Sequence, residues 1–347
     1  MHRYLLLKDK HMTTITQIIR AQYETRSPMP EEVIHAVTFP RPQLTSGQVL
    51  VAVLAAPINP SDVLTLTGDY GILPSLPAFG GNEGVGRVVE LGPDVKFPPV
   101  GQTVLLPVSC GTWSSHVVAD AAKLIPLPNE ADPQQLSMMT VNPPTAALML
   151  SEFVDLKPGD WVIQNVANSG VGSYLIQLAK IRGFKTVNIV RRESAVAEVK
   201  ALGGDVVLVD GEKLAKRVKE ATVGATILLG IEAVGGAATD RLASCLSTGG
   251  TLVNYGMMSG EACQISPKSF IFNDITLKGF WLAKWFRQST RDQQTALYGE
   301  LTKLIATGKL HARIHATFDV NDIKAAVAAA NAGERDGKIL VVPRHPV

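Results

Sequence analysis

The spacing of apolar residues along the chain changes near residue 128. Before that point, apolar runs of strand length alternate with Pro- and Gly-containing turns, as at 49–55 and 84–91. Further short strands are expected at 117–119 and 123–125. Closely spaced short strands with turn residues between them are typical of a barrel-like β domain. The first third of the chain is therefore predicted to be β-rich.

Beyond residue 128, strand-like and helix-like segments alternate. The expected helices are 134–139, 144–153, 171–182, 195–202, 292–307 and 320–332. The expected strands are 160–166, 186–190, 206–209, 225–229, 251–255, 275–280 and 338–342. Alternating units of this length specify a parallel, doubly wound sheet with a crevice at the carboxyl ends of its strands. The pattern predicts an α/β chain of about two domains, which its length of 347 residues also suggests.

Composition and charge exclude several classes of function. Hydrophobic residues make up 46% and charged residues 18% of the chain, and the net charge is only +2. This balance gives no electrostatic case for nucleic acid or an anionic membrane. No apolar run approaches the roughly 18–20 residues of a membrane helix. We expect a cytoplasmic protein, or one of the mitochondrial matrix if a transit peptide was removed.

Only three cysteines occur, at positions 110, 245 and 263. Few, widely spaced cysteines argue against a disulfide framework and against a cysteine-rich zinc lobe. The first twelve residues, 1–12, end in His11-Met12, resemble a vector-derived leader and are left out of the fold prediction.

A loop of small residues, 167–172 (ANSGVG), directly follows the expected strand 160–166 and opens a helix. Free backbone N–H groups and the positive end of the helix dipole favour a phosphate at such a place. The loop departs from G-x-G-x-x-G, because Ala167 and Ser169 replace its first two glycines. The strand–loop–helix setting favours a dinucleotide site over a plain tight turn.

Cofactor choice is indicated by the end of the second strand of this fold. An NAD-binding chain places Asp or Glu there to accept from the ribose 2′-hydroxyl, whereas this chain has Arg191 and Arg192, followed by Glu193. Two guanidinium groups suit a 2′-phosphate. The pattern favours NADPH over the alternative, a solvated charge pair at a strand end.

With these features the chain resembles the medium-chain dehydrogenase/reductase superfamily. The resemblance implies a β-rich GroES-like catalytic domain, 13–135 with 284–347, and an inserted NADPH-binding Rossmann domain, 136–283. The zinc-dependent members carry a Cys in the segment matching 58–62 and a His where Asn82 stands, and this chain has neither. Too few donors remain for a catalytic zinc, so no metal is expected.

Six segments resemble the trans-2-enoyl-thioester reductases of fatty-acid synthesis within the zinc-free branch. They are NPSD (59–62), GDYGILP (68–74), TVNPPTA (140–146), QNVANSGVG (164–172), IVRR (189–192) and GFWLAKW (279–285). The resemblance implies a catalytic tyrosine, Tyr70. It also implies nucleotide contacts at Asn142, Asn168, Ser169, Gly170, Val171, Arg191, Arg192, Tyr255, Gly256, Met257, Met258, Phe280, Trp281, Leu282, Ala283 and Lys338.

The implied reaction adds hydride to Cβ of a 2-enoyl thioester and then a proton to Cα. Charge develops on the thioester oxygen, and the Tyr70 phenol would donate to it or supply the proton. The structural alternative is that Tyr70 is a partly buried surface aromatic. We interpret Glu83 as a polar anchor of the β domain, and aromatic residues such as Trp113 as core or acyl-pocket walls.

Two other functions remain open at this point. An NADPH-dependent quinone or enone oxidoreductase of the same superfamily would use the same hydride step on another acceptor. A non-enzymatic NADPH-binding protein would keep the fold without turnover, which an intact Tyr70 disfavours. In each case the partner is a small molecule, and a homodimer is expected, because the strand 275–280 would leave an open sheet edge.

Overall fold

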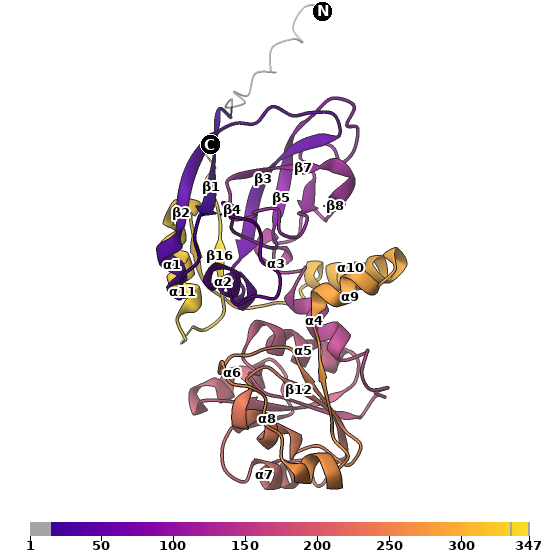
Figure 1. Cartoon of the computed structure of the whole chain (residues 1–347). Helices are drawn as coiled ribbons and strands as arrows, with labels where there is room; N and C mark the ends of the chain where they lie inside the picture. Colours follow the sequence, from indigo (N-terminus) through magenta and orange to yellow (C-terminus); the bar gives the residue numbers. More distant parts are fainter. Residues whose placement is uncertain (1–14, 334, 346–347) are drawn as a thin grey trace, which may run out of the picture. The chain divides into compact units, whose positions relative to one another are not determined.

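The computed structural model describes residues 15–333 and 335–345. Its contacts divide the chain into two compact units, residues 15–137 with 314–345, and residues 138–313 (Figure 1). The leader expected over residues 1–12 lies outside the described residues. The first unit thus joins two stretches that lie far apart in the sequence.

The first unit is built on two sheets. A three-stranded sheet has the order β2-β1-β4, and a seven-stranded sheet has the order β15-β16-β3-β5-β6-β8 with β7 paired to β3. The strands are β1 (Gln17–Tyr23), β2 (Ile34–Pro40), β3 (Gln48–Pro57), β4 (Ala78–Phe79), β5 (Val85–Leu91), β6 (Thr103–Leu105), β7 (His116–Asp120), β8 (Ile125–Pro126), β15 (Ile314–Phe318) and β16 (Lys338–Val341). Its helices are α1 (Pro30–Val33), α2 (Pro60–Thr67), α3 (Pro133–Leu136) and α11 (Ile323–Asn331), with short 3-10 turns η1 (Ala121–Lys123) and η4 (Val320–Asp322).

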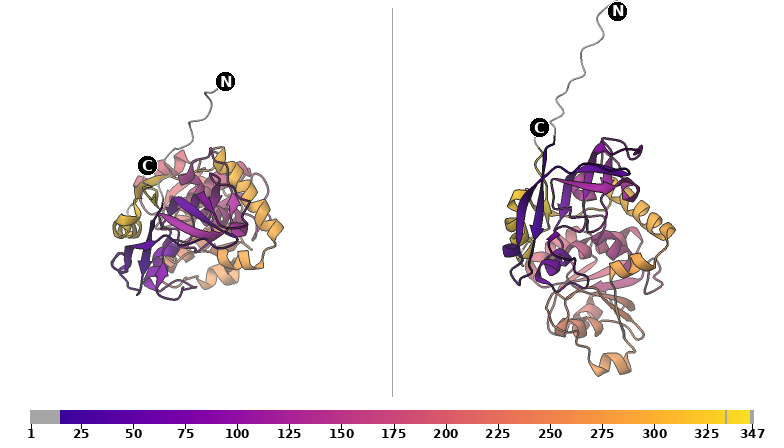
Figure 2. Two further views of the ribbon diagram at one scale, coloured as in Figure 1. Left: turned by 90° about the horizontal axis from the view of Figure 1, so that it is seen from above. Right: turned by 45° about the horizontal axis from the view of Figure 1, so that its top comes forward.

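The C-terminal segment completes this first unit. Strand β16 pairs antiparallel with β3, with Leu340 opposite Pro57. Helix α11 packs against α1 and β2, so the yellow end of the chain lies beside its indigo beginning in Figures 1 and 2. Because of this return, Lys338 at the start of β16 comes close to residues near 59.

Trp113 belongs to the core of the first unit. Its side chain is fully buried and donates from Nε1 to the Pro57 carbonyl at 3.1 Å. A Cβ on Gly80 would come within 2.3 Å of the indole, so only glycine leaves room for it. The core interpretation of this aromatic is therefore the right one, and the acyl-pocket interpretation is wrong for it.

The second unit is a six-stranded, all-parallel sheet with the order β11-β10-β9-β12-β13-β14. The chain order reverses between β9 and β12, which is the switch point that makes a crevice in such sheets. The strands are β9 (Trp161–Gln164), β10 (Lys185–Val190), β11 (Val206–Val209), β12 (Ile227–Glu232), β13 (Thr251–Asn254) and β14 (Thr276–Gly279). This Rossmann-like sheet confirms the predicted α/β fold class.

Helices α5 and α6 connect the first strands of this sheet, and α7 and α8 the next. The helices are α4 (Asn142–Met149), α5 (Gly170–Ile181), α6 (Val196–Ala201), α7 (Leu214–Ala221), α8 (Gly236–Ala243), α9 (Leu282–Gln288) and α10 (Arg291–Ala306), with a 3-10 turn η2 (Glu193–Ala195) and a π-helical turn η3 (Lys268–Phe272). Contacts place residues 284–313 in this unit, whereas the expected catalytic domain included them. The reason is that α10 packs against α4, and Gln177 of α5 donates to the His311 carbonyl at 2.8 Å.

Two expected elements differ in the structure. The strand expected at 123–125 is found two residues later, as β8 (Ile125–Pro126), because the Asp120 carboxylate accepts from the Ala122 N–H at 3.0 Å and starts the turn η1. The strand expected at 225–229 begins instead at Ile227 and extends to Glu232. Helix α2 was not expected, since Pro57 and Pro60 suggested only a break.

Candidate functional site

The predicted phosphate loop joins β9 to the N-terminus of α5. Ser169 caps this helix, and its hydroxyl accepts from the Gly172 N–H at 3.1 Å. A Cβ on Gly172 would come within 2.6 Å of the Ala167 carbonyl and 2.7 Å of the Val166 carbonyl. Glycine at position 172 therefore allows the helix to start against the loop, and the first-turn N–H groups of Gly170 and Val171 point to the place where an anion would bind.

Polar side chains beneath the loop fix its position. Gln164, at the end of β9, donates from Nε2 to the Gly172 carbonyl at 3.1 Å and to the Asn188 Oδ1 at 2.9 Å. Tyr255, just after β13, is hydrogen-bonded through its hydroxyl to Ser169. Burial raises the pKa of Tyr255 to about 12, so it stays a neutral phenol. The predicted residues Ser169 and Tyr255 thus share one hydrogen-bonded cluster.

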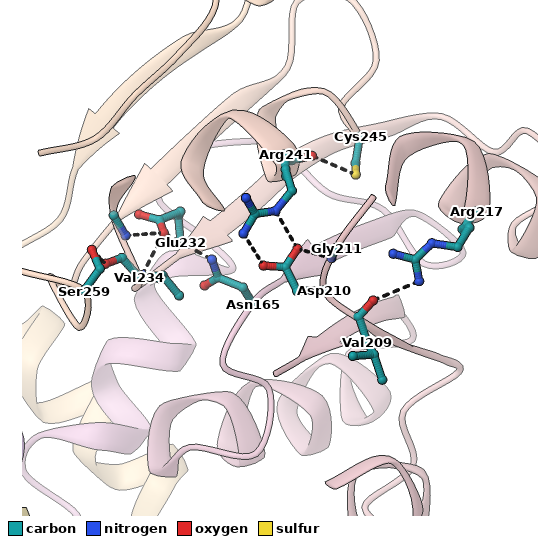
Figure 3. Close-up of polar contacts among 11 residues, drawn as sticks. Asn165, Val209, Asp210, Gly211, Arg217, Glu232, Val234, Arg241, Cys245 and Ser259 are labelled. Carbon is teal, nitrogen blue, oxygen red and sulfur yellow. Dashed lines mark hydrogen bonds and ion pairs between the residues drawn. The ribbon is translucent and has the colours of Figure 1, made fainter. Parts of the chain in front are cut away.

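Glu232 ties three strand ends together, and the sequence analysis missed it (Figure 3). The fully buried Glu232 carboxylate accepts from Asn165 Nδ2 at 3.1 Å and from the N–H groups of Val234 and Gly235, both at 2.7 Å. It also accepts from Asn254 Nδ2. The available sequence signal was an acidic residue at the end of an apolar strand, three positions before the glycine pair Gly235 and Gly236.

The turn that begins at Tyr255 is held by the backbone of the neighbouring strand. The Tyr255 N–H donates to the Glu232 carbonyl at 2.9 Å, and the Met258 N–H to the Ala233 carbonyl at 3.0 Å. The side chains of Met257 and Met258 are exposed, while Gly256 fits against Ala233, whose carbonyl would lie 2.8 Å from an added Cβ. These predicted residues therefore form an open edge at the carboxyl ends of the strands.

The predicted basic pair directly follows β10. Arg191 is exposed and Arg192 is half-buried. On the neighbouring strand, Asp210 follows β11 and donates its N–H to the Val190 carbonyl at 2.8 Å. Asp210 forms a two-point ion pair with Arg241 of α8, at 2.9 Å and 2.5 Å (Figure 3). The sequence analysis did not find this third arginine, Arg241.

The segment after β14 carries four more of the predicted contacts. The Phe280 N–H donates to the Asn254 carbonyl at 2.8 Å, which extends the sheet by one bond, and its ring packs edge-on against Phe153. Trp281 precedes the first residue of α9, and the Arg287 guanidinium lies 4.8 Å from its ring centre. Leu282 and Ala283 form the first turn of α9.

Asn142, another predicted contact, is the first residue of α4 and is buried.

In the first unit, Tyr70 follows the C-terminus of α2. Gly68 ends the helix in a left-handed conformation, with φ of 92°. The N–H groups of Gly68, Asp69 and Tyr70 all donate to the Leu64 carbonyl, at 3.0, 2.9 and 3.2 Å. The half-buried Tyr70 is thus attached to the helix end by its backbone rather than carried on a free loop.

A buried polar cluster lies at the other end of α2. Asn59 precedes the helix and donates from Nδ2 to the Glu83 carboxylate at 2.6 Å, while Lys338 Nζ donates to Asn59 Oδ1. The Asp62 carboxylate accepts from the Asn59 N–H at 2.7 Å. Glu83 is fully buried and acts as the polar anchor that the sequence analysis expected.

Burial shifts the ionisation of this cluster in both directions. Burial raises the pKa of Asp62 to about 6, although the Asn59 N–H and the Lys338 ammonium oppose the shift. Burial also lowers the pKa of Lys338 to about 8, against the negative charge of Glu83. Lys338, predicted as a nucleotide contact, therefore has partners of its own within the first unit.

The structure thus groups the predicted residues by unit. Tyr70 and Lys338 belong to the first unit and lie at opposite ends of α2. Fifteen others belong to the second unit, where they follow the carboxyl ends of the strands or begin a helix. They are Asn142, Asn168, Ser169, Gly170, Val171, Arg191, Arg192, Tyr255, Gly256, Met257, Met258, Phe280, Trp281, Leu282 and Ala283. Their nucleotide contacts stay predictions.

Within residues 15–333 and 335–345, no group of three or more His, Cys, Asp or Glu side chains is arranged to hold a metal ion. In the same part of the chain, no helix combines the length and apolar character needed to span a bilayer.

Two family profiles match the chain, one in each unit. The alcohol dehydrogenase GroES-like domain matches residues 45–129, and the zinc-binding dehydrogenase profile matches residues 170–297. The mitochondrial enoyl-(acyl-carrier-protein) reductase of Caenorhabditis elegans is 40% identical over 77% of this chain and 78% of its own. That of Rattus norvegicus is 37% identical over 87% and 82%.

The chain belongs to the enoyl-(acyl-carrier-protein) reductases of the medium-chain dehydrogenase/reductase superfamily. The resemblance drawn from its motifs is confirmed, as is the pairing of a GroES-like with a Rossmann-like domain. Solved structures agree with this family. Etr1p in complex with NADP and crotonyl-CoA matches with a TM-score of 0.84 at 26% identity, over 94% of this chain and 99% of that one. A quinone reductase, described as putative and NADPH-dependent, from Bacillus thuringiensis matches with a TM-score of 0.85 at 27% identity and the same coverage.

Proposed function

We propose that the chain reduces the activated C=C bond of 2-enoyl thioesters with NADPH, adding hydride to Cβ and a proton to Cα. The observation that carries the proposal is the 40% identity, over 77% of the chain, to an enoyl-(acyl-carrier-protein) reductase. The attachment of Tyr70 to the end of α2 supports it, because a proton donor must be held in place to serve one oxygen.

The second unit fits a nicotinamide dinucleotide. Gly172 lets the start of α5 approach the loop so closely that a side chain there would collide with the Ala167 carbonyl. The first-turn N–H groups of Gly170 and Val171 would then bind the diphosphate beside Ser169, whose own N–H donates to the Val166 carbonyl at 2.9 Å. When bound, the cofactor supplies the hydride. The remaining predicted contacts, after β13 and β14 and at Asn142, would hold its nicotinamide half.

NADPH is favoured over NADH by the side chains that follow β10. Arg191 is exposed at the strand end, and it stands where an NAD-binding chain has an Asp or Glu that accepts from the ribose 2′-hydroxyl. Together with Arg192 it would bind the 2′-phosphate, with each charged hydrogen bond contributing roughly 1.5–3 kcal/mol. Titrating NADPH and NADH into wild type and into Arg191→Ala/Arg192→Ala tests this; tighter NADH binding by the wild type would refute it.

Tyr70 would donate its phenolic proton toward the thioester oxygen as negative charge develops there. A donor aimed at this charge lowers the barrier, and the same hydroxyl could deliver the proton to Cα. Gly68 sets the turn that precedes Tyr70, so the backbone rather than the phenol fixes the shape of the segment.

The substrate class is tested by turnover. NADPH oxidation is followed with crotonyl-CoA, an enoyl thioester of acyl-carrier protein, a simple enone and a simple quinone. We expect the highest kcat/KM with a thioester. Preference for the quinone would favour the quinone oxidoreductase alternative. The fold match to the Bacillus thuringiensis protein is the observation that supports testing it. No turnover with any acceptor would favour a binding-only protein.

A homodimer is proposed from the free edge of the Rossmann-like sheet. Strand β14 ends the sheet order, and the exposed side chains Phe270, Ile271 and Phe272 precede it. Open strand edges and apolar side chains at such a place favour pairing with a second copy. One solved relative is a heterodimer of Etr1p and Etr2p from Candida tropicalis. Sedimentation at the 37.1 kDa mass of one chain would refute the dimer.

We propose a cellular compartment for the chain from the names of its relatives. The reductases of Caenorhabditis elegans and Rattus norvegicus are named mitochondrial, which favours the matrix over the cytoplasm. Fractionation of cells that express the untagged chain, with matrix and cytoplasmic marker proteins measured in parallel, distinguishes the two.

A further inference from the structure

An ion pair lies at the end of β11, the strand next to the proposed 2′-phosphate site. Asp210 follows β11, and both of its oxygens are engaged by Arg241 of α8, from Nε at 2.9 Å and from Nη2 at 2.5 Å (Figure 3). Oδ1 also accepts the Gly211 N–H at 2.8 Å. These three bonds fix the carboxylate and direct one guanidinium edge onto it.

The register of the sheet places Asp210 next to Arg191. Val209 lies opposite Val190 in the parallel pairing of β11 and β10, and the Asp210 N–H donates to the Val190 carbonyl at 2.8 Å. Asp210 and Arg191 are therefore the first residues beyond the two adjacent strand ends. A negative charge at position 210 would therefore repel an anion that binds at position 191.

Other charged groups around this strand end are already engaged or lie on neighbouring turns. Arg217 of α7 donates from Nη1 to the Val209 carbonyl at 2.8 Å and from Nε to the Glu212 carbonyl at 3.2 Å. Glu193 lies beyond Arg192 in η2 and is exposed. Arg241 is thus the side chain that pairs directly with the Asp210 carboxylate.

We propose that Arg241 is a specificity-determining residue for the phosphorylated nucleotide and acts through Asp210. By pairing with both carboxylate oxygens, Arg241 neutralises a charge that would otherwise repel a 2′-phosphate held by Arg191. NADH lacks that phosphate and is nearly indifferent to the pair. The inference rests on the proposed use of NADPH, and adds a residue on α8 that is not among the predicted nucleotide contacts.

The hydrogen bonds of its guanidinium indicate that Arg241 acts through Asp210 rather than by contacting the nucleotide. Nε and Nη2, the edge that binds anions at two points, are both used by Asp210. The pair is only partly exposed, with side-chain exposures of 38% for Arg241 and 27% for Asp210, so solvent screens the carboxylate incompletely once its partner is removed.

The experiment measures dissociation constants for NADPH and NADH by titration calorimetry on the full chain, without substrate. Arg241→Met should weaken NADPH binding about tenfold while NADH changes by less than about twofold. Asp210→Asn retains an oxygen for the Gly211 N–H, and alone should leave NADPH affinity within about threefold. In the double variant, with the carboxylate gone, NADPH affinity should return to within about threefold of wild type.

Two further variants serve as controls. Lys216→Met removes a positive charge from exposed α7, and Arg217→Met removes one beside Val209 without freeing a carboxylate. Neither should reproduce the selective loss. The Arg241→Met loss should also shrink as salt rises from about 0.05 to 0.5 M, because screening weakens the repulsion.

The outcomes separate this inference from the proposed function. A wild-type chain that prefers NADH refutes the use of NADPH itself. A wild-type preference for NADPH, combined with an Arg241→Met loss that is equal for both nucleotides, refutes the role of Arg241 alone. A double variant that stays as weak as Arg241→Met would show that Arg241 contacts the nucleotide directly or only supports the fold, and would overturn the action through Asp210.

Discussion

Around α2 in the first unit, charged and amide side chains bind one another inside the core, whereas at the strand ends of the second unit several face solvent. Lys338, Asn59 and Glu83 form a closed chain of hydrogen bonds, all within fully or nearly fully buried residues. Arg191, Met257 and Met258 are exposed by contrast. The first arrangement resists change, and the second can still bind a ligand.

The difference indicates how the two units divide their tasks. A buried charge that loses its partner is costly, so the cluster around α2 favours one arrangement and thereby orients the helix that ends at Tyr70. An exposed guanidinium loses little when it is alone, so it can exchange water for phosphate. Variants in the closed cluster should therefore change stability, and variants at the open edge should change binding.

The largest effect is expected for Lys338→Met. This change leaves the buried Glu83 and Asp62 carboxylates without their positive neighbour and should destabilise the chain by about 3–5 kcal/mol in urea unfolding followed by circular dichroism. Arg191→Ala is the matched variant at the open edge and should unfold like the wild type. Unchanged stability with lost NADPH affinity would instead make Lys338 a nucleotide contact, as the family resemblance predicts.

Tyr70→Phe should lower kcat on an enoyl-CoA by roughly 10²–10³-fold, which is the usual cost of one donor to a developing oxyanion. NADPH affinity should stay at its wild-type value, because Phe keeps the backbone N–H that bonds the Leu64 carbonyl. The thermal midpoint, measured alongside, tests whether the phenol also stabilises the fold. A variant that turns over normally would remove Tyr70 from the mechanism and favour the quinone-reductase alternative.

Gly172→Ala should displace the phosphate loop, since the new Cβ would lie 2.6 Å from the Ala167 carbonyl. We expect a stability loss of about 1–3 kcal/mol together with weaker binding of both nucleotides. Gly299→Ala in α10 is the control, because its Cβ would meet no atom within 4 Å, and this change should stabilise by about 0.5–1 kcal/mol. Equal stability and equal nucleotide affinity of the two variants would contradict the need for glycine at position 172.

The last effect concerns Asp62 and depends on pH. Its pKa is raised by burial from 3.8 to about 6, so the folded state binds the proton more tightly than the unfolded state does. Stability from this group is present below pH 4 and is lost as the pH rises through about 6. Asp62→Asn should therefore be more stable than wild type by about 3 kcal/mol at pH 7.5, the free energy of a shift of roughly two pKa units, with most of the difference gone near pH 4. A difference that is independent of pH would contradict this ionisation.

Local patterns predicted much of the second unit. The apolar run before residue 165, the small residues of 167–172 and the helix after them determine a strand, a turn and a helix start without help from distant residues. The position of Arg191 follows from the same local reasoning, because the length of one helix and one loop fixes where the next strand ends. Tyr70 was found only through the family motif around it.

Other parts of the site depend on partners that the sequence does not place together. Lys338 meets Asn59 across 279 positions, Asn165 meets Glu232 across 67, and Arg241 meets Asp210 across 31. The first two pairs form because a sheet sets strands side by side in an order unlike their order in the chain, with β16 beside β3 and β12 beside β9. The third pair forms because helix α8 brings Arg241 to the end of β11. The sequence by itself determined the elements, the small-residue loop at 167–172 and the basic strand end, because these depend on neighbours within a few residues. Only the tertiary structure decided which charges are buried against one another and which stay exposed, because strand order and helix packing determine those distances.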